Sequence, residues 1–466
     1  MSDQAVSFAY LAAGILFILA LKWLSHPLTA RRGLLMGEIG MVLAVGSTLM
    51  KAEIVDFQWI LIALFIGTAI GIPLGQFVPM TAMPQRIAFS HAFGALAAAL
   101  VGTAEYALRR PEIDRFTMGA LGFEVVLGFL TFTGSLIAFG KLQGIVRDKP
   151  VLFRGQNVLN LAVLATAVVL VVVLVVDPGL SVVFPVMIGL ALLYGVSFVL
   201  RIGGADMPVV ISLLNSLAGL SGAAMGLVLN NHVLILAGAL DGSSGFLLSL
   251  IMSRAMNRSF GNVLFGGFGA ETTAEGGAGP PRPVRSSSAE EAAMILSAAR
   301  TVVIVPGFGM AAAQAQHKVR ELADLLVRRG TDVKFAIHPV AGRMPGHMNV
   351  LLAEANVPYE RLYDLEHINP EFPDTDVALV IGANDVVNPA ARHDASSPIY
   401  GMPILDVDKA NCVMVIKRSM RSGFAGIENE LFYLDRTMML FGDAKAMAGE
   451  IVDEVAKLPG AVTAVA

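Results

Sequence analysis

The first 260 residues contain nine apolar stretches, each about as long as a helix that crosses a lipid bilayer. They lie near residues 5–24, 33–50, 58–78, 87–107, 118–140, 158–177, 181–200, 207–228 and 232–253. About 20 apolar residues in a helix span the hydrocarbon of a bilayer. Only 15% of the 466 residues are charged and 55% are hydrophobic, whereas soluble domains carry about 25% charged residues. The sequence therefore predicts a polytopic α-helical membrane domain with nine spans over residues 1–260.

Basic residues between the spans predict an orientation. An odd number of spans places the two ends of the domain on opposite sides of the membrane. The connections on the C-terminal side carry Arg31, Arg32, Arg86, Lys141, Arg147, Lys149, Arg154, Arg201, Arg254 and Arg258, and those on the other side carry Lys51, Arg109, Arg110 and Arg115. Cytoplasmic connections are enriched in Lys and Arg, so we expect the C-terminal side to be cytoplasmic. The first stretch lacks a basic flank and a cleavage site, and we interpret it as a span.

The predicted spans contain His91, Glu124, Asn215 and Asp241, and polar or ionisable groups are costly at membrane depth and functional by default. Glu38 and Glu105 lie close to span ends, where we favour a structural role. His91 either passes protons through its imidazole or is a helix-end histidine bonded to a carbonyl group. Asn215 either holds a water, bonds His91 across helices, or makes a plain interhelical hydrogen bond. Glu124 is either a relay residue or a carboxylate that reaches one interface, and the pattern assigns no role to Asp241.

Residues 261–291 are rich in Gly, Pro and Ser and lack periodicity, which predicts a mobile linker. The net charge of -4 argues against a nucleic-acid partner. The single cysteine, Cys412, excludes an intramolecular disulfide and a cysteine-based metal cluster. No metal site is predicted.

Residues 292–466 have the composition of a soluble domain, with strands alternating with helical segments. Buried strands are predicted at 301–305, 333–337, 377–381 and 413–416, and an amphipathic helix at 310–329. Such alternation predicts an α/β, doubly wound, Rossmann-like domain with a parallel sheet.

The first predicted strand is followed by Gly307, Phe308 and Gly309, with Ala312 completing a G-x-G-x-x-A fingerprint. Glycines at these positions allow a tight turn and let the backbone approach a pyrophosphate near the start of a helix. The flanking strand and helix make this match more specific than an isolated one.

The second predicted strand ends at His338, without the acidic residue that binds the ribose of NAD. Lys417, Arg418 and Ser419 follow another strand, where two cations and a hydroxyl suit a phosphate dianion. A plain solvated strand end is the alternative. Together the two features favour NADP over NAD.

Three further Gly-rich turns, at 340–346, 382–387 and 422–426, follow strands or lie near their ends and are able to close over a ligand. Asp385 lies just beyond a strand end. Beside a nicotinamide its carboxylate is expected to have a raised pKa; the alternative is a helix N-cap before Asn388.

These features together resemble the beta subunit of the proton-translocating NAD(P) transhydrogenases. The matching segments are 305–310, 338–349, 382–385, 388–391, 417–420 and 440–445 in the soluble part, and 206–215, 242–245 and 255–259 in the membrane part. The resemblance covers nearly the whole chain, and the linker alone lacks a clear counterpart.

The resemblance implies an enzyme that couples reversible hydride transfer between NAD(H) and NADP(H) to proton translocation. Residues 417–419 would grip the 2'-phosphate of NADP(H), and the segment 423–426 would form a lid. His91, Asn215 and Asp385 are the implied catalytic and coupling residues. Phe308 stands where tyrosine is expected. The implied cofactor-binding residues are Gly307, Phe308, Gly309, Val340, Ala341, Gly342, Arg343, Met344, Pro345, Gly382, Ala383, Asn384, Asp385, Val386, Gly401, Met402, Lys417, Arg418, Ser419, Gly423, Phe424, Asp443 and Ala444.

The resemblance also implies a missing partner. An alpha subunit would carry the NAD(H)-binding domain, and the enzyme would be active only with it, as a dimer of alpha-beta units in a bacterial-type inner membrane. One alternative is an ion channel or transporter gated by a nucleotide-sensing domain, which would bind NADP(H) without turnover. A soluble reductase on a passive anchor is excluded because an anchor needs one span.

Overall fold

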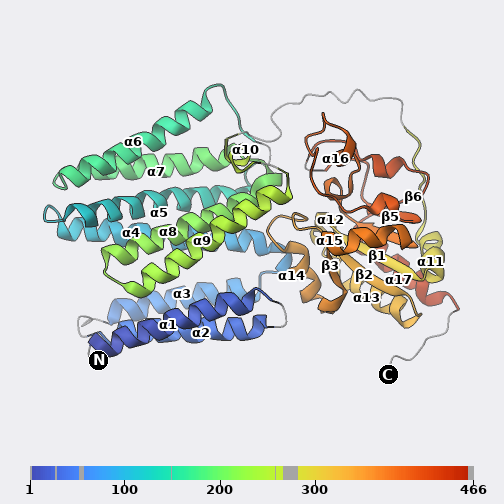
Figure 1. Ribbon diagram of the computed structural model, residues 1–466, viewed down its shortest axis with the longest axis horizontal. Helices are drawn as coiled ribbons and strands as arrows, with labels where there is room; N and C mark the ends of the chain where they lie inside the picture. Colours follow the sequence, from blue (N-terminus) through green and yellow to red (C-terminus); the bar gives the residue numbers. More distant parts are fainter. Residues whose placement is uncertain are drawn as a thin grey trace. The chain divides into compact units, whose positions relative to one another are not determined.

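The computed structural model describes residues 3–26, 29–51, 57–147, 150–257, 259–265, 282–423 and 425–459. The chain divides into two compact units (Figure 1). The first comprises Met1–Arg201 and Val210–Ser249, and the second comprises Ile202–Val209 and Leu250–Ala466. Each unit is described separately below.

Within the described residues, nine helices are long and apolar enough to cross a membrane. They are α1 (Asp3–Leu24), α2 (Ala30–Leu49), α3 (Gln58–Gln76), α4 (Met83–Arg109), α5 (Arg115–Leu142), α6 (Gln156–Val176), α7 (Val183–Leu200), α8 (Met207–Val228) and α9 (His232–Ala255). All nine predicted spans are confirmed as helices. The helix bounds differ most from the predicted bounds at α4 and α5, because polar residues at their ends are also helical. Asp114 accepts a hydrogen bond from the Thr117 amide and so caps α5.

Small residues bring α8 and α9 into close contact. The Ser212 hydroxyl donates to the Gly245 carbonyl at 2.9 Å, and the Ser216 hydroxyl donates to the Gly242 carbonyl at 2.6 Å. A methyl group on Gly219 would overlap the backbone of Gly242. In lipid, such close backbone approach and interhelical hydrogen bonds stabilise helix pairs.

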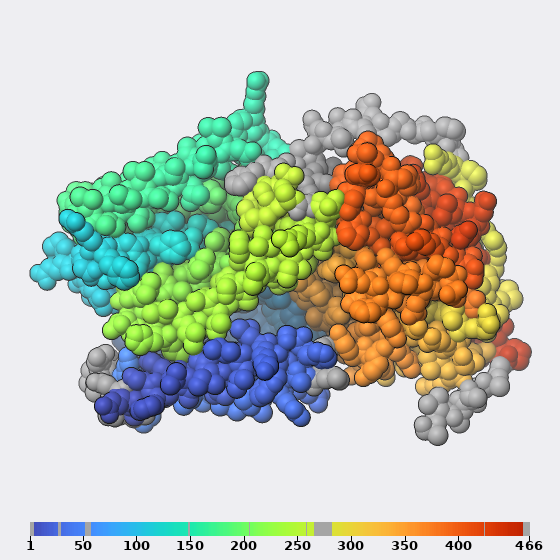
Figure 2. All heavy atoms as spheres, in the orientation of Figure 1, coloured from blue at the N-terminus to red at the C-terminus, as the bar shows by residue number. Residues whose placement is uncertain are grey.

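The outer surface of the first unit carries large apolar side chains. Helices α1 (blue) and α9 (yellow-green) form part of the face seen in Figure 2. On these helices Leu11, Phe246 and Leu247 are exposed, as expected where helices border lipid or other membrane helices. In α3, no described residue is buried.

The second unit contains a six-stranded parallel sheet in the order β3-β2-β1-β4-β5-β6. The strands are β1 (Thr301–Pro306), β2 (Asp332–Ile337), β3 (Leu362–Asp364), β4 (Val377–Ile381), β5 (Cys412–Lys417) and β6 (Thr437–Phe441). This is the doubly wound order, in which the chain reverses direction between β1 and β4. The predicted α/β domain is therefore confirmed. The sequence pattern missed β3, which is very short, and β6.

Alternate strand residues face the two sides of the sheet. Val303, Ala378 and Val413 pack against one cluster that includes Phe372 and Leu431. Helices α13 (Gln316–Arg328), α15 (Leu365–Ile368) and α17 (Ala444–Lys457) pack against the sheet, and α11 (Ala289–Ala298) packs against α17. The unit also contains α12 (Phe308–Ala312), α14 (His347–Glu354) and α16 (Ala390–His393). Burial on both faces explains why the strands are almost continuously apolar.

Two predictions for this unit need correction. The predicted helix at 310–329 is confirmed over α13 but is not continuous, because α12 is a separate helix and Gln314 between the two has a left-handed φ of 52°. The predicted linker 261–291 overlaps folded structure: Ser286 forms a parallel bridge with Met439, and α11 begins at Ala289. The linker residues 266–281 lie outside the described residues. The six-residue helix α10 (Phe260–Phe265) lies at the start of that predicted linker.

Candidate functional site

A cavity of about 500 Å³ opens at the carboxyl ends of the strands in the second unit. Its lining includes residues that follow β1 and β4, the two strands between which the chain reverses direction. Open α/β sheets bind ligands in the crevice at this position. The volume lies in the range of small-molecule and cofactor sites.

Three glycines form the floor of this cavity by direct backbone contact. The Gly307 amide donates to the Ile381 carbonyl at 2.9 Å, and the Gly309 amide donates to the Gly382 carbonyl at 2.9 Å. A methyl group on Gly309 would lie 2.6 Å from the Gly382 Cα atom, and Gly382 itself has a φ of +66°. Side chains are therefore excluded here, and the backbone is left open toward a ligand.

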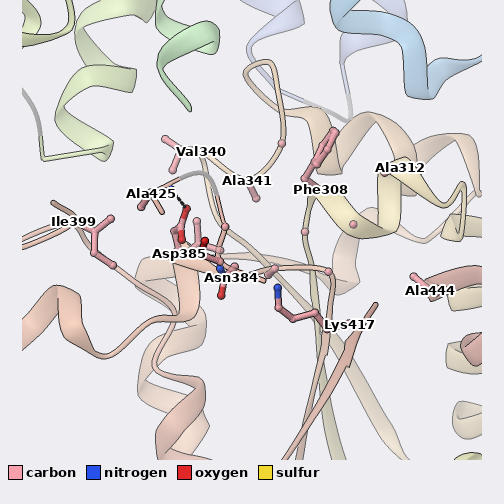
Figure 3. Close-up of a pocket in the computed structure, with 18 of the residues that line it drawn as sticks. Phe308, Ala312, Val340, Ala341, Asn384, Asp385, Ile399, Lys417, Ala425 and Ala444 are labelled. Atoms are coloured by element: carbon pink, nitrogen blue, oxygen red, sulfur yellow. Dashed lines mark hydrogen bonds between the residues drawn. The ribbon is translucent and has the colours of Figure 1, made fainter. Parts of the chain in front are cut away.

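The loop after β2 forms one wall, and Phe308 extends toward it. The Arg343 guanidinium carbon lies 4.4 Å from the centre of the Phe308 ring, which is a cation–π contact. The tyrosine hydroxyl expected at position 308 is absent, but the ring still has a packing role. In Figure 3, Phe308, Val340 and Ala341 are drawn at the same pocket.

Two buried histidines shape this loop. The His338 Nε2 atom donates to the Pro403 carbonyl at 2.8 Å, and its Nδ1 atom accepts from the Val340 amide at 3.2 Å. His347 Nδ1 accepts from the Arg343 amide at 3.2 Å. Burial lowers the pKa of each histidine to about 4; the Pro403 carbonyl opposes this for His338, and the Arg343 charge adds to it for His347. Both rings are therefore neutral near neutral pH.

Asp385 fastens the segment that follows β5. Its Oδ2 atom accepts a hydrogen bond from the Ala425 amide at 2.9 Å (Figure 3). The Asn429 side-chain amide donates to the Asn384 carbonyl at 2.9 Å, so the same segment is also held at a second point. The alternative role of Asp385 as an N-cap is not what the structure shows, because Asp385 starts a 3-10 turn, Asp385–Val387.

Two cations lie at the carboxyl end of β5. Lys417 points toward Asn384 and Asp385 (Figure 3), and its ammonium donates to the Arg421 carbonyl. Burial lowers the Lys417 pKa, while the Asp385 charge acts in the opposite direction. The Arg418 guanidinium lies 3.5 Å from the Asp443 carboxylate, whose side chain caps α17. Arg418 is 64% exposed and faces solvent at the cavity edge.

The structure brings most of the predicted cofactor residues together. Those that line the cavity are Gly307, Phe308, Gly309, Val340, Ala341, Gly342, Gly382, Ala383, Asn384, Asp385, Val386, Met402, Lys417, Arg418, Gly423 and Ala444. Those outside its lining are Arg343, Met344, Pro345, Gly401, Ser419 and Asp443. Phe424 lies outside the described residues.

Sequence reasoning left out several residues that also line the cavity. They are Met256, Pro398, Ile399, Ile416 and Gly442, whereas the lining residues Ala312, Ser422 and Ala425 belong to the fingerprint and the Gly-rich turn already identified in the sequence. Pro398 and Ile399 lie between elements and carry no motif, so no sequence signal points to them. Among the described residues, no group of three His, Cys, Asp or Glu side chains is placed to hold a metal ion.

In the first unit, Asn215 bonds Asp241. The Asn215 side-chain amide on α8 donates to Asp241 Oδ1 on α9 at 3.0 Å. The bond between Asn215 and Asp241 therefore joins α8 to α9. The His91 Nδ1 atom is buried and has no hydrogen-bond partner within the described part of the chain.

Glu124 is fully buried, so the interpretation as a carboxylate reaching an interface is wrong. It lies on α5 against α4, where a methyl group on Gly102 would lie 2.9 Å from Glu124 Oε1. The Ser221 hydroxyl of α8 donates to the Glu124 carbonyl at 2.9 Å. Glu105, by contrast, forms an ion pair with Arg109 at 2.6 Å near the end of α4.

Nine long apolar helices and a doubly wound sheet with a crevice cavity define a polytopic membrane protein with a dinucleotide-type domain. The sequence matches the family described as NAD(P) transhydrogenase beta subunit over residues 6–454. Two curated relatives from Rhodospirillum rubrum, one assigned to a named strain, are both called NAD(P) transhydrogenase subunit beta. Each is 52% identical over 463 residues, which cover 97% of this chain and 99% of the relative. The chain belongs to the NAD(P) transhydrogenase beta subunit family.

Proposed function

We propose that this chain binds NADP(H) in the crevice cavity and couples hydride transfer between NAD(H) and NADP(H) to proton translocation. The observation that carries this proposal is the charge pattern of the cavity. Two cations, Lys417 and Arg418, line it, and the second strand ends at His338 without a carboxylate. That pattern suits a ribose 2'-phosphate and disfavours the free 2'-hydroxyl of NAD.

Residues of the cavity match the parts of the dinucleotide. The backbone around Gly307, Gly309 and Gly382 leaves room for the pyrophosphate. Lys417 and Arg418 would hold the 2'-phosphate, Arg418 being oriented by Asp443. Bound NADP(H) supplies the nicotinamide that accepts or gives the hydride. Asp385 keeps the segment that includes Ala425 against the cavity.

The membrane part would supply the driving force. Moving one proton through about 100 mV yields about 2.3 kcal/mol. Because 1.36 kcal/mol is a tenfold change, one proton per hydride shifts the equilibrium ratio by roughly 50-fold. We infer that one conformational equilibrium is biased both by proton binding near His91 and Asn215 and by nucleotide binding near Asp385. Such coupling is reciprocal, so each binding event changes the affinity of the other.

The subunit name implies an alpha partner. We propose that the partner carries the NAD(H) site, because the second unit contains one Rossmann-type crevice among its described residues. We further propose a dimer of alpha-beta units in a bacterial inner membrane, with the nucleotide domain in the cytoplasm. The excess of Lys and Arg on that side supports the orientation.

The nucleotide preference is tested with the detergent-solubilised chain by equilibrium binding of NADP⁺ and NAD⁺. Arg418→Gln removes one charged contact of about 1.5–3 kcal/mol, so NADP⁺ affinity should fall roughly 10- to 100-fold while NAD⁺ affinity is unchanged. Arg421→Gln is the matched control, because Arg421 is exposed and lies outside the cavity lining. Equal wild-type affinity for both nucleotides, or no effect of Arg418→Gln, would contradict the proposed 2'-phosphate site.

A further inference from the structure

We propose that Asp241 is a proton-binding residue of the membrane path and that Asn215 holds its carboxylate in place. This inference rests on the proposed proton translocation and adds a residue to it. Asp241 lies near the middle of α9 (His232–Ala255). A carboxylate at that depth is strongly unfavourable against hydrocarbon and marks an ion pathway or a water-filled cavity.

The two carboxylate oxygens have different surroundings. Oδ1 accepts the Asn215 amide at 3.0 Å. Oδ2 lies over Gly219 of α8, where a methyl group would come within 2.8 Å of it. Gly219 therefore keeps space open for this oxygen. Because Asn215 donates to Oδ1 whether or not Oδ2 carries a proton, the carboxylate keeps one position in both protonation states.

Few other ionisable groups face this position. Helix α8 contains none, and the other ionisable residues of α9 are His232 and Arg254 at its ends. Helix α1 packs against Leu236 of α9 through Gly14. Its ionisable residues are Asp3 and Lys22 near its ends and Tyr10, which pairs with Thr48.

These contacts assign separate roles to the two side chains. Asn215 cannot ionise, so it cannot carry a proton by itself. A hydronium ion gives its proton to Oδ2 of Asp241, leaving a neutral acid and a water molecule, and the reverse step releases the proton. Protonation of Asp241 removes a negative charge, which favours release of a proton from the imidazole of His91 when the two groups interact.

The test uses the chain reconstituted with its alpha partner in sealed vesicles, with hydride transfer and internal pH recorded together. Asp241→Asn keeps the hydrogen-bonding shape but cannot ionise. We expect proton pumping to fall at least tenfold, with Asp241→Glu restoring a substantial part of it. Ser243→Ala is the matched control on the same helix, because the Ser243 hydroxyl bonds its own backbone at Ala239; it should pump normally. Unchanged pumping in Asp241→Asn would overturn the role of Asp241.

Water access gives a second readout that does not depend on activity. In a Cys412→Ser background, Asp241→Cys carries the single thiol of the chain and should react with a water-soluble charged thiol reagent. An inert thiol would place position 241 against lipid and overturn the inference. Failure of this inference is distinguishable from failure of the proposed function. A wild-type enzyme that transfers hydride without pumping refutes proton coupling itself. Pumping by both the wild type and Asp241→Asn refutes only the proposed role of Asp241.

Discussion

His338 links two segments around the cavity through a single neutral ring. Its Nε2 atom donates to the Pro403 carbonyl while its Nδ1 atom accepts from the Val340 amide. A protonated ring cannot accept, so protonation breaks the second bond. The folded pKa is lowered to about 4, and the unfolded value is about 6.5.

Acid should therefore destabilise the second unit through His338. Between about pH 6.5 and about pH 4 the unfolded chain binds a proton that the folded chain does not, so the free energy of unfolding falls as the pH falls. The expected loss at about pH 5 is about 2 kcal/mol. Scanning calorimetry near neutral pH and near pH 5 measures it. His338→Gln should reduce this pH dependence, and substitution of the exposed His317 should leave it intact; equal pH dependence in all three proteins would contradict the assignment.

Single residues differ in how far the sequence reveals them. Gly307, Gly309, Lys417 and Arg418 were predicted because strand ends and spacing mark them. The anchoring role of His338 was missed because it depends on Pro403, which is distant in sequence. Asp241 had no assigned role for the same reason, since its partner Asn215 lies on another helix.

At the scale of elements, the turn after β4 and the turn after β1 pack backbone to backbone. Gly382 has a φ of +66° and would overlap Gly309 if it carried a methyl group. Gly330 also has a positive φ, of +92°, but nothing lies within 4 Å of its added methyl group. Alanine substitutions at these two glycines therefore distinguish the cost of backbone strain from the cost of steric overlap.

Gly330→Ala should cost about 1 kcal/mol, from strain alone. Gly382→Ala should cost that amount plus roughly 1–3 kcal/mol for the overlap, and it should weaken NADP⁺ binding. Urea unfolding monitored by labelling of Cys412 reports on the second unit, because this half-buried cysteine lies in β5. If the free energy of unfolding fell by the same amount in the two variants, the overlap at Gly382 would be relieved without cost.

Long elements were predicted more accurately than short ones. All nine spans were predicted because a stretch of about 20 apolar residues has few structural alternatives to a membrane-spanning helix. The four strands predicted within the sheet were also found. The break between α12 and α13 was missed, because Gln314 in a left-handed conformation follows from tertiary contacts and carries no glycine or proline signal.

At the scale of the whole molecule, the described chain combines a membrane unit that contains buried polar groups with a unit that contains one crevice cavity. The composition break and the length of the apolar stretches predicted this division. The proposed need for a partner came from the family and from the one Rossmann-type crevice among the described residues. The proposed coupling would be a property of the assembled enzyme, so neither sequence patterns nor one chain displays it.

The most direct test of the central claim uses sealed vesicles that contain the chain and its alpha partner. NADPH and an NAD⁺ analogue are added, and hydride transfer and vesicle pH are followed in the same sample. The account predicts that hydride transfer creates a pH difference, that an uncoupler abolishes the difference and speeds hydride transfer, and that His91→Ala pumps poorly. Hydride transfer at full rate with no pH change and no response to the uncoupler would contradict it.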